Sequence, residues 1–162
     1  MREPENIQQV TELGIDLMGF IFWPKSPRYV KSVTVKAGIV PNLPNSKVTR
    51  NAKKVKRVGV FVDEMPQTVI THAYNYRLDY IQLHGNESPI YIENLKRTLI
   101  PDILSDVKII KALSIREADD VKRWREYENV ADLLLFDTKC KCVGGSGEQF
   151  DWSVLDKYDG NI

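Results

Sequence analysis

The stretch LLLFDTKCKCVGGSGEQFDW, residues 133–152, joins an apolar run to one carboxylate, two cysteines and a glycine-rich loop. The apolar run has the length and composition of a buried β-strand. Because Asp137 stands where the run ends, we expect its carboxyl group at the end of a strand and the glycines in the loop that follows. The fold therefore depends on how many such strands the chain contains.

Four other short segments are rich in branched and aromatic residues. Together with the run quoted above they predict five strands, at residues 16–22, 57–62, 79–85, 107–113 and 132–137. Their hydrophobicity is nearly continuous and does not alternate, which is typical of parallel strands that are covered on both faces. The chain is therefore predicted to contain a parallel sheet.

Stretches of helical period separate the predicted strands. In residues 4–14, Pro4 suits a first helical turn and Gly14 can end the helix with a positive φ. Residues 88–99 and 114–128 predict two further helices, with Ser88 and Ser114 as N-cap candidates, and residues 151–158 predict a short helical turn. The α/β alternation fits either an open doubly wound sheet or a section of a (β/α)₈ barrel, and the spacing leaves this choice open.

The composition predicts one globular domain over residues 1–162, with 43% apolar and 28% charged residues. The net charge of +1 argues against nucleic acid or a membrane as the main partner. Residues 41–57 hold a basic run without aromatic residues for base stacking, so we interpret them as a solvated loop insertion. Neither a signal peptide nor a membrane span is recognisable, which predicts a cytoplasmic protein.

Four polar residues fall at the carboxyl ends of predicted strands, where parallel α/β folds build their ligand sites. Asp137 is either a general acid, whose pKa partial desolvation would raise, or a capping aspartate. Gln82 and His84 are two residues apart and point to the same side of their strand, although a lone histidine more often makes a structural hydrogen bond. Arg28 is either an anion-binding or an ordinary surface arginine.

The loop after Asp137 carries weaker signals. Cys140 and Cys142 supply only two soft ligands where zinc usually takes four, so we predict neither a metal site nor a redox site. The run Gly144, Gly145, Ser146 and Gly147 has neither a Walker nor a dinucleotide-binding spacing, and a flexible lid is an equally good interpretation.

Several motifs, in this order, resemble those of one enzyme family. They are REPENI (2–7), GFIFWPKSPRYV (19–30), VGVFV (58–62), IQLHG (81–85) and LLLFDT with GGSGEQFDW (133–152). Over essentially its whole length, the chain resembles the phosphoribosylanthranilate isomerases, (β/α)₈ TIM barrels of tryptophan biosynthesis. The resemblance implies an Amadori rearrangement of a small phosphosugar substrate, without cofactor or metal.

The resemblance also assigns roles to residues. Asp137 matches the general acid, and Arg28 matches the arginine that holds the anthranilate carboxylate. Gln82 and His84 match residues that line the pocket. The residues Gly144, Gly145, Ser146 and Gly147 match the loop over the site.

Two elements of the family pattern fall outside the given sequence. The first strand, with the general-base cysteine, would precede Met1, and the phosphate-binding seventh and eighth strands would follow Ile162. We therefore expect strands two to six of an incomplete TIM barrel, inactive alone; the oligomeric state cannot be read. Two alternatives remain: another phosphosugar-binding barrel isomerase, or a non-enzymatic flavodoxin-like module with strand order 2-1-3-4-5.

Overall fold

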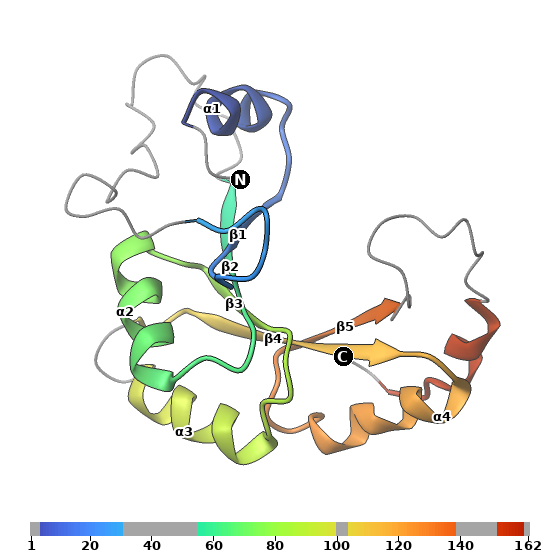
Figure 1. Cartoon of the computed structure of the whole chain (residues 1–162). Coiled ribbons are helices and arrows are strands. Elements are labelled where there is room, and N and C mark those ends of the chain that lie inside the picture. Colours follow the sequence, from blue (N-terminus) through green and yellow to red (C-terminus); the bar gives the residue numbers. More distant parts are fainter. Residues whose placement is uncertain (1–3, 31–54, 100–103, 139–151, 161–162) are drawn as a thin grey trace.

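A computed structural model describes residues 4–30, 55–99, 104–138 and 152–160. Five parallel strands form one sheet in the order β1-β2-β3-β4-β5 (Figure 1). They are β1 (Leu17–Ile21), β2 (Lys56–Phe61), β3 (Tyr80–Leu83), β4 (Lys108–Ile115) and β5 (Leu133–Thr138). All five predicted strands are confirmed, with ends that differ from the prediction by one or two residues.

The strand order decides between the two architectures that the spacing left open. Every strand pairs in parallel with the strand that follows it in the chain. A flavodoxin-like sheet would place β2 at its edge, next to β1, and β3 on the other side of β1. The sequential order excludes that alternative and agrees with a section of a (β/α)₈ barrel.

The helices begin where proline precedes an amphipathic stretch. The three longest are α1 (Pro4–Glu12), α2 (Pro66–Tyr76) and α3 (Pro89–Leu99), and each has proline at its first position, where the missing N–H costs nothing. Gly14 follows α1 with a φ of 75°, as predicted. Shorter elements are α4 (Ala118–Val121) and the 3₁₀-helices η1 (Lys122–Glu126) and η2 (Trp152–Lys157).

One of the two predicted N-caps is confirmed and the other is wrong. The Ser88 hydroxyl accepts a hydrogen bond from Tyr91 N at 3.2 Å, in the first turn of α3. Ser114 lies inside β4, because the burial of Leu113 and Ile115 continues the strand past it. The helix starts later, where the Asp120 carboxylate accepts Arg116 N at 2.8 Å.

The hydrophobic core lies between the sheet and its helices, and Figure 1 shows α2, α3 and α4 along one side of the sheet. Its fully buried side chains include Phe20, Phe61, Ile81, Leu83, Ile109, Val69, Ile92 and Leu95. On the other face, Leu17, Leu133 and Leu135 are 49%, 40% and 40% exposed. The described residues thus cover one face of the sheet rather than the predicted two, because a barrel covers its inner face with other strands and not with helices.

Aspartates stabilise the amino ends of the strands. Asp79 accepts Arg57 N at 2.8 Å, and Asp132 accepts Ile109 N at 2.7 Å. Each carboxylate also pairs with a lysine, Lys56 and Lys96 respectively, at 3.0 Å. The carboxylates at the amino ends of the strands are therefore used to bind backbone N–H groups. In barrel folds, the active site lies at the opposite, carboxyl ends of the strands.

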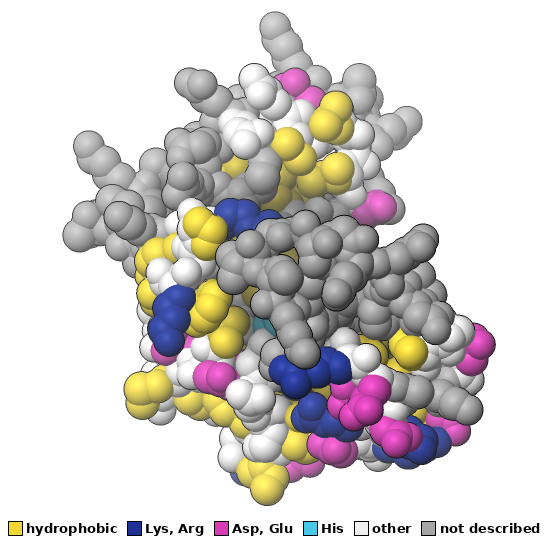
Figure 2. All heavy atoms as spheres, turned by 45° about the vertical axis from the view of Figure 1, so that its right-hand side comes forward, with side chains coloured by type: hydrophobic (Ala, Val, Ile, Leu, Met, Phe, Trp, Pro, Cys, Tyr) yellow, Lys and Arg dark blue, Asp and Glu magenta, His cyan; other side chains and the backbone are white. Residues whose placement is uncertain are grey.

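The outer surface carries both signs of charge. Figure 2 shows basic and acidic side chains side by side over α4 and η1, where Lys122 pairs with Asp119 and Arg123 with Glu126. Over these two elements, the paired charges give no single-sign field that would attract an anionic polymer. In the described ranges, the helices are all too short or too polar to span a bilayer.

Candidate active site

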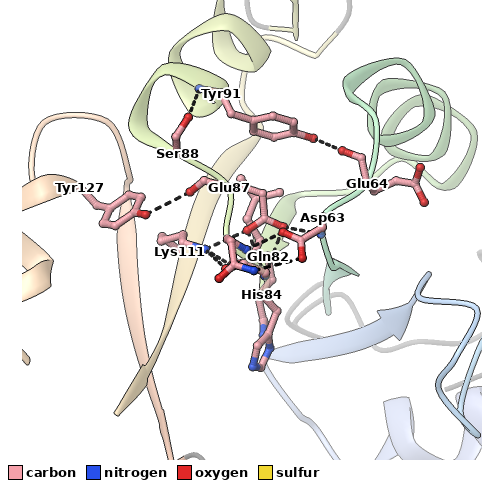
Figure 3. Close-up of polar contacts among 12 residues, drawn as sticks. Asp63, Glu64, Gln82, His84, Glu87, Ser88, Tyr91, Lys111 and Tyr127 are labelled. Carbon is pink, nitrogen blue, oxygen red and sulfur yellow. Dashed lines mark hydrogen bonds and ion pairs between the residues drawn. The ribbon is translucent and has the colours of Figure 1, made fainter. Parts of the chain in front are cut away.

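Three polar side chains meet at the carboxyl ends of β3 and β5. His84 Nε2 lies 3.0 Å from Asp137 Oδ2, and Gln82 Nε2 lies 2.9 Å from His84 Nδ1. Figure 3 shows Gln82, which belongs to β3, and His84, which directly follows that strand, with the imidazole ring pointing away from the buried loop contacts. The structure therefore brings together three of the residues that the sequence singled out, Gln82, His84 and Asp137.

The His84–Asp137 contact crosses the whole width of β4. Leu83, the last residue of β3, pairs with Lys111, so His84, which follows it, stands level with Ala112. Ala112 in turn pairs with Leu135, two residues before Asp137. The imidazole of His84 therefore reaches past β4 to a carboxylate on the strand beyond it.

The hydrogen bonds define a tautomer of His84. An ionised carboxylate can only accept hydrogen bonds, so a neutral His84 ring that bonds to the Asp137 carboxylate carries its proton on Nε2. Nδ1 of that tautomer is an acceptor, and the Gln82 amide can donate to it. Both contacts of His84 are therefore satisfied by one tautomer.

Asp137 is partly accessible. Its side chain is 50% exposed, so its neighbours shield about half of it. Ser114, which pairs with Asp137 in the β4–β5 register, stands beside it at the same level of the sheet. The carboxyl group is therefore held by His84 while one side remains open to a ligand.

Arg28 lies apart from this group. It belongs to the turn that follows β1, with its backbone N–H donating to the Ser26 hydroxyl at 3.1 Å, and its side chain is exposed. The turn stands at the carboxyl end of β1, on the same side of the sheet as the carboxyl ends of β3 and β5. Its anion-binding role stays a prediction.

Other predicted elements fall outside the described residues: Gly144, Gly145, Ser146, Gly147, Cys140, Cys142 and most of the basic loop at 41–57. Within the described part of the chain, histidine, aspartate and glutamate form no cluster of three that could hold a metal ion.

A second polar group, which the sequence reasoning missed, lies behind His84. Lys111 Nζ lies 2.8 Å from Glu87 Oε2, and their side chains are only 1% and 2% exposed. Figure 3 shows Lys111, Glu87 and Asp63 together beneath the loop after β3. The available signal was a lysine in the middle of the apolar run 107–113 and a glutamate just after the histidine.

Tyrosines border this buried group. Tyr127 Oη donates to the Glu87 carbonyl oxygen at 3.1 Å, and Tyr91 Oη donates to the Glu64 carbonyl oxygen at 2.8 Å. Burial raises the pKa of Tyr91 to about 12, and it raises the pKa of Tyr127 as well. Both phenols therefore remain protonated donors at neutral pH.

Comparison with known proteins places the chain in one family. The family model described as N-(5'-phosphoribosyl)anthranilate (PRA) isomerase matches residues 1–161. The N-(5'-phosphoribosyl)anthranilate isomerase of Parabacteroides distasonis is 39% identical over 99% of this chain and 66% of its own length. That of Phocaeicola vulgatus is 38% identical over 99% and 68%. The chain thus spans about two thirds of the length of these relatives.

Solved structures agree with this match. The phosphoribosylanthranilate isomerase of Thermotoga maritima superposes with a TM-score of 0.71 at 32% identity, covering 98% of this chain and 70% of that one. A structure of the isomerase in complex with reduced 1-(o-carboxyphenylamino)-1-deoxyribulose 5-phosphate superposes with a TM-score of 0.66 at 28% identity, covering 98% and 68%. By the family match, the identities and the shared fold, the chain belongs to the N-(5'-phosphoribosyl)anthranilate isomerase family of tryptophan biosynthesis.

Proposed function

We propose that the protein acts as a phosphoribosylanthranilate isomerase, which converts N-(5-phosphoribosyl)anthranilate to 1-(2-carboxyphenylamino)-1-deoxyribulose 5-phosphate. The observation that carries the proposal is the His84–Asp137 pair at the carboxyl ends of β3 and β5, in a chain that the family model matches from residue 1 to 161. The relative solved with a reduced form of this product supports the same ligand class.

Asp137 is the general acid in this mechanism. The reaction begins when Asp137, in its protonated carboxylic acid form, donates its proton to the ribose ring oxygen, so that the ring opens to a Schiff base. Donation leaves Asp137 as a carboxylate, and the Nε2–H of His84, 3.0 Å from Oδ2, stabilises that charge. His84 also orients the carboxyl group, so that Oδ1 can face the substrate.

A general base then removes the proton from C2′ to give the enolamine, which tautomerises to the product. By the resemblance, this base is a cysteine on the first strand of the family barrel. Arg28, Gly144, Gly145, Ser146 and Gly147 contribute to substrate binding in the same proposal. Arg28 holds the anthranilate carboxylate with its guanidinium fork, and the four loop residues, which lie outside the described part of the chain, take the role that the resemblance implies.

We further propose that residues 1–162 provide strands two to six of the barrel and are inactive as an isolated polypeptide. The sequential order of five parallel strands and the coverage of about two thirds of the relatives support this assignment. In the family pattern, the general base and the phosphate-binding loops belong to other strands. Turnover by the purified 162-residue polypeptide near that of a complete relative would contradict it.

Substitution of Asp137 by asparagine tests the central role. The asparagine side chain keeps the shape but cannot donate a proton as an acid, so kcat should fall by about 10²- to 10⁴-fold with KM changed only a few-fold. The assay is the disappearance of N-(5-phosphoribosyl)anthranilate, measured on the protein as its gene encodes it. Asp119→Asn, which changes an exposed aspartate on α4, is the control.

An unchanged kcat in Asp137→Asn would remove Asp137 as the acid. The same preparation also separates the proposed substrate from that of another phosphosugar isomerase. Greater turnover of an imidazole-type ribotide than of the anthranilate substrate would favour the alternative enzyme.

A further inference from the structure

The loop that carries His84 is held by a buried ion pair. The ammonium group of Lys111, in β4, donates to three acceptors: Gly85 O at 2.7 Å, Glu87 Oε2 at 2.8 Å and Leu83 O at 3.4 Å. Lys111 therefore has a partner for each of its three donors, although it is 1% exposed. Two of these partners are the carbonyl groups of the residues on either side of His84.

The Glu87 carboxylate binds backbone groups of the same loop and of its neighbour. It accepts the backbone N–H of Gly85, at 3.0 Å to Oε2, and the backbone N–H of Asp63, at 2.9 Å to Oε1. His84 N itself donates to Phe61 O at 2.9 Å, which continues the β2–β3 ladder by one residue. The peptide groups before, at and after His84 are thus all bound, and the two charged side chains bind most of them.

A buried ion pair is a poor way to gain stability. The cost of removing two charges from water commonly equals or exceeds their attraction, and apolar residues of similar volume often do as well or better. The side chains around Lys111 would suit such a replacement, because Ile109 and Leu113 on the same face of β4 are buried among apolar residues. The pair instead fixes a geometry: because every hydrogen bond of the two charged groups is made, they hold the backbone around His84 in one conformation.

We propose that Lys111 and Glu87 are positioning residues, which hold the peptide groups around His84 so that its Nε2–H meets the Asp137 carboxylate. This inference rests on the proposed function, because the contact that it protects is the one assigned to the general acid. Tyr127, the residue that follows η1, also contacts both side chains of the pair: its hydroxyl donates to Glu87 O, and its ring lies under Lys111 Nζ at 5.6 Å from the centroid.

The test compares two variants with a control in the protein as its gene encodes it. Lys111→Met removes the ammonium group and keeps the length of the side chain. Glu87→Gln keeps the shape and one acceptor oxygen, but it removes the charge and turns the other acceptor into an NH₂ donor. The control is Val69→Ala on α2, a fully buried residue that makes none of these contacts and so lowers stability without touching the loop.

Two readouts separate positioning from a structural role. The first is the division of the effect between kcat and KM, corrected for the folded fraction. The second is ¹⁵N NMR of the imidazole of His84, which reports the proton on Nε2 and its hydrogen bond, with His72 on α2 as internal reference. We expect Lys111→Met to lower kcat about tenfold to a hundredfold at nearly constant KM, because misplacement of a catalytic group by about 1 Å costs that much.

Lys111→Met should also change the His84 signal and leave that of His72 unchanged. Glu87→Gln should change both readouts in the same direction but less, and Val69→Ala should change neither. If Lys111→Met does not fold, Glu87→Gln decides alone. If Lys111→Met and Glu87→Gln both give the same kinetics and the same His84 signal as Val69→Ala, the positioning role is overturned.

Failure of the proposed function gives a different result. In that case the unsubstituted protein does not isomerise N-(5-phosphoribosyl)anthranilate, but the His84 signal still responds to Lys111→Met. Because the NMR readout needs no substrate, the two failures are distinguishable.

Discussion

Gly85→Ala should destabilise the loop that carries His84, because a β-carbon has no room there. An ideal Cβ at Gly85 would lie 2.6 Å from Asp63 Cγ and 2.7 Å from Asp63 N, both inside van der Waals contact. Asp63 cannot simply turn away. Its Oδ1 accepts Asn86 N at 2.6 Å, and its backbone has a φ of 49°, which few residues other than glycine adopt easily.

The magnitude follows from the contacts that must be given up. Moving Asp63 stretches its N–H bond to Glu87 Oε1 and the Asn86 N bond to its own carboxylate. Both are hydrogen bonds to charged groups, each with a net contribution of about 1.5–3 kcal/mol, and partial loss of the two gives about 2–4 kcal/mol. Overpacking of well-filled sites usually costs about 1–3 kcal/mol, which agrees.

The assay is chemical denaturation of the protein as its gene encodes it, read by fluorescence and by circular dichroism. Gly19→Ala is the matched control: it makes the same change in β1, where a Cβ would meet nothing within 4 Å, so it should be neutral or stabilise by up to about 1 kcal/mol. If Gly85→Ala and Gly19→Ala change the free energy of unfolding equally, the loop is not packed as the structure describes.

Two further predictions concern the hydrogen bonds around the site. Gln82→Leu removes the donor to His84 Nδ1, which loses its hydrogen bond; kcat should fall by up to about tenfold with little change in stability, and kinetics with imidazole NMR will check this. An unaltered NMR signal would refute the hydrogen bond from Gln82 to His84. The second prediction is the effect of alkaline pH on Tyr91. The pKa of its phenol is about 12 in the folded protein and about 10 in the unfolded chain. Its contribution to the free energy of unfolding is therefore complete below about pH 10 and is lost as the pH rises towards 12. Tyr91→Phe, which also loses the bond to Glu64 O, should therefore show a shallower decline in the free energy of unfolding between about pH 9 and about pH 11.5, measured with urea; equal slopes would contradict the cause assigned to the shift.

The positions of the strands were readable from the sequence because they depend on local composition. Apolar runs bounded by polar residues mark β1 to β5, and Pro4, Gly14 and Ser88 mark helix ends by their own backbone chemistry. Local pattern failed at Ser114, where the burial of Leu113 and Ile115 carried the strand through a residue that suits an N-cap. It also failed to single out α2, although Pro66 stands at its start.

The contacts among the candidate site residues could also be predicted in part. A carboxyl-end position and the motif resemblance together selected Gln82, His84 and Asp137, and the structure brings these three together. The parallel arrangement alone accounts for this, since the carboxyl ends of parallel strands share one side of a sheet.

The sequence by itself thus determined the elements, their α/β class and the end of the sheet where polar groups gather. Only the tertiary structure decided which side chains touch. His84 and Asp137 are 53 residues apart and meet because the register sets Ala112 between them, and Lys111 reaches Glu87 only because β3 and β4 are neighbours. Hydrophobic period is a local property of the chain, whereas a hydrogen bond between two side chains depends on the registers of every strand between them.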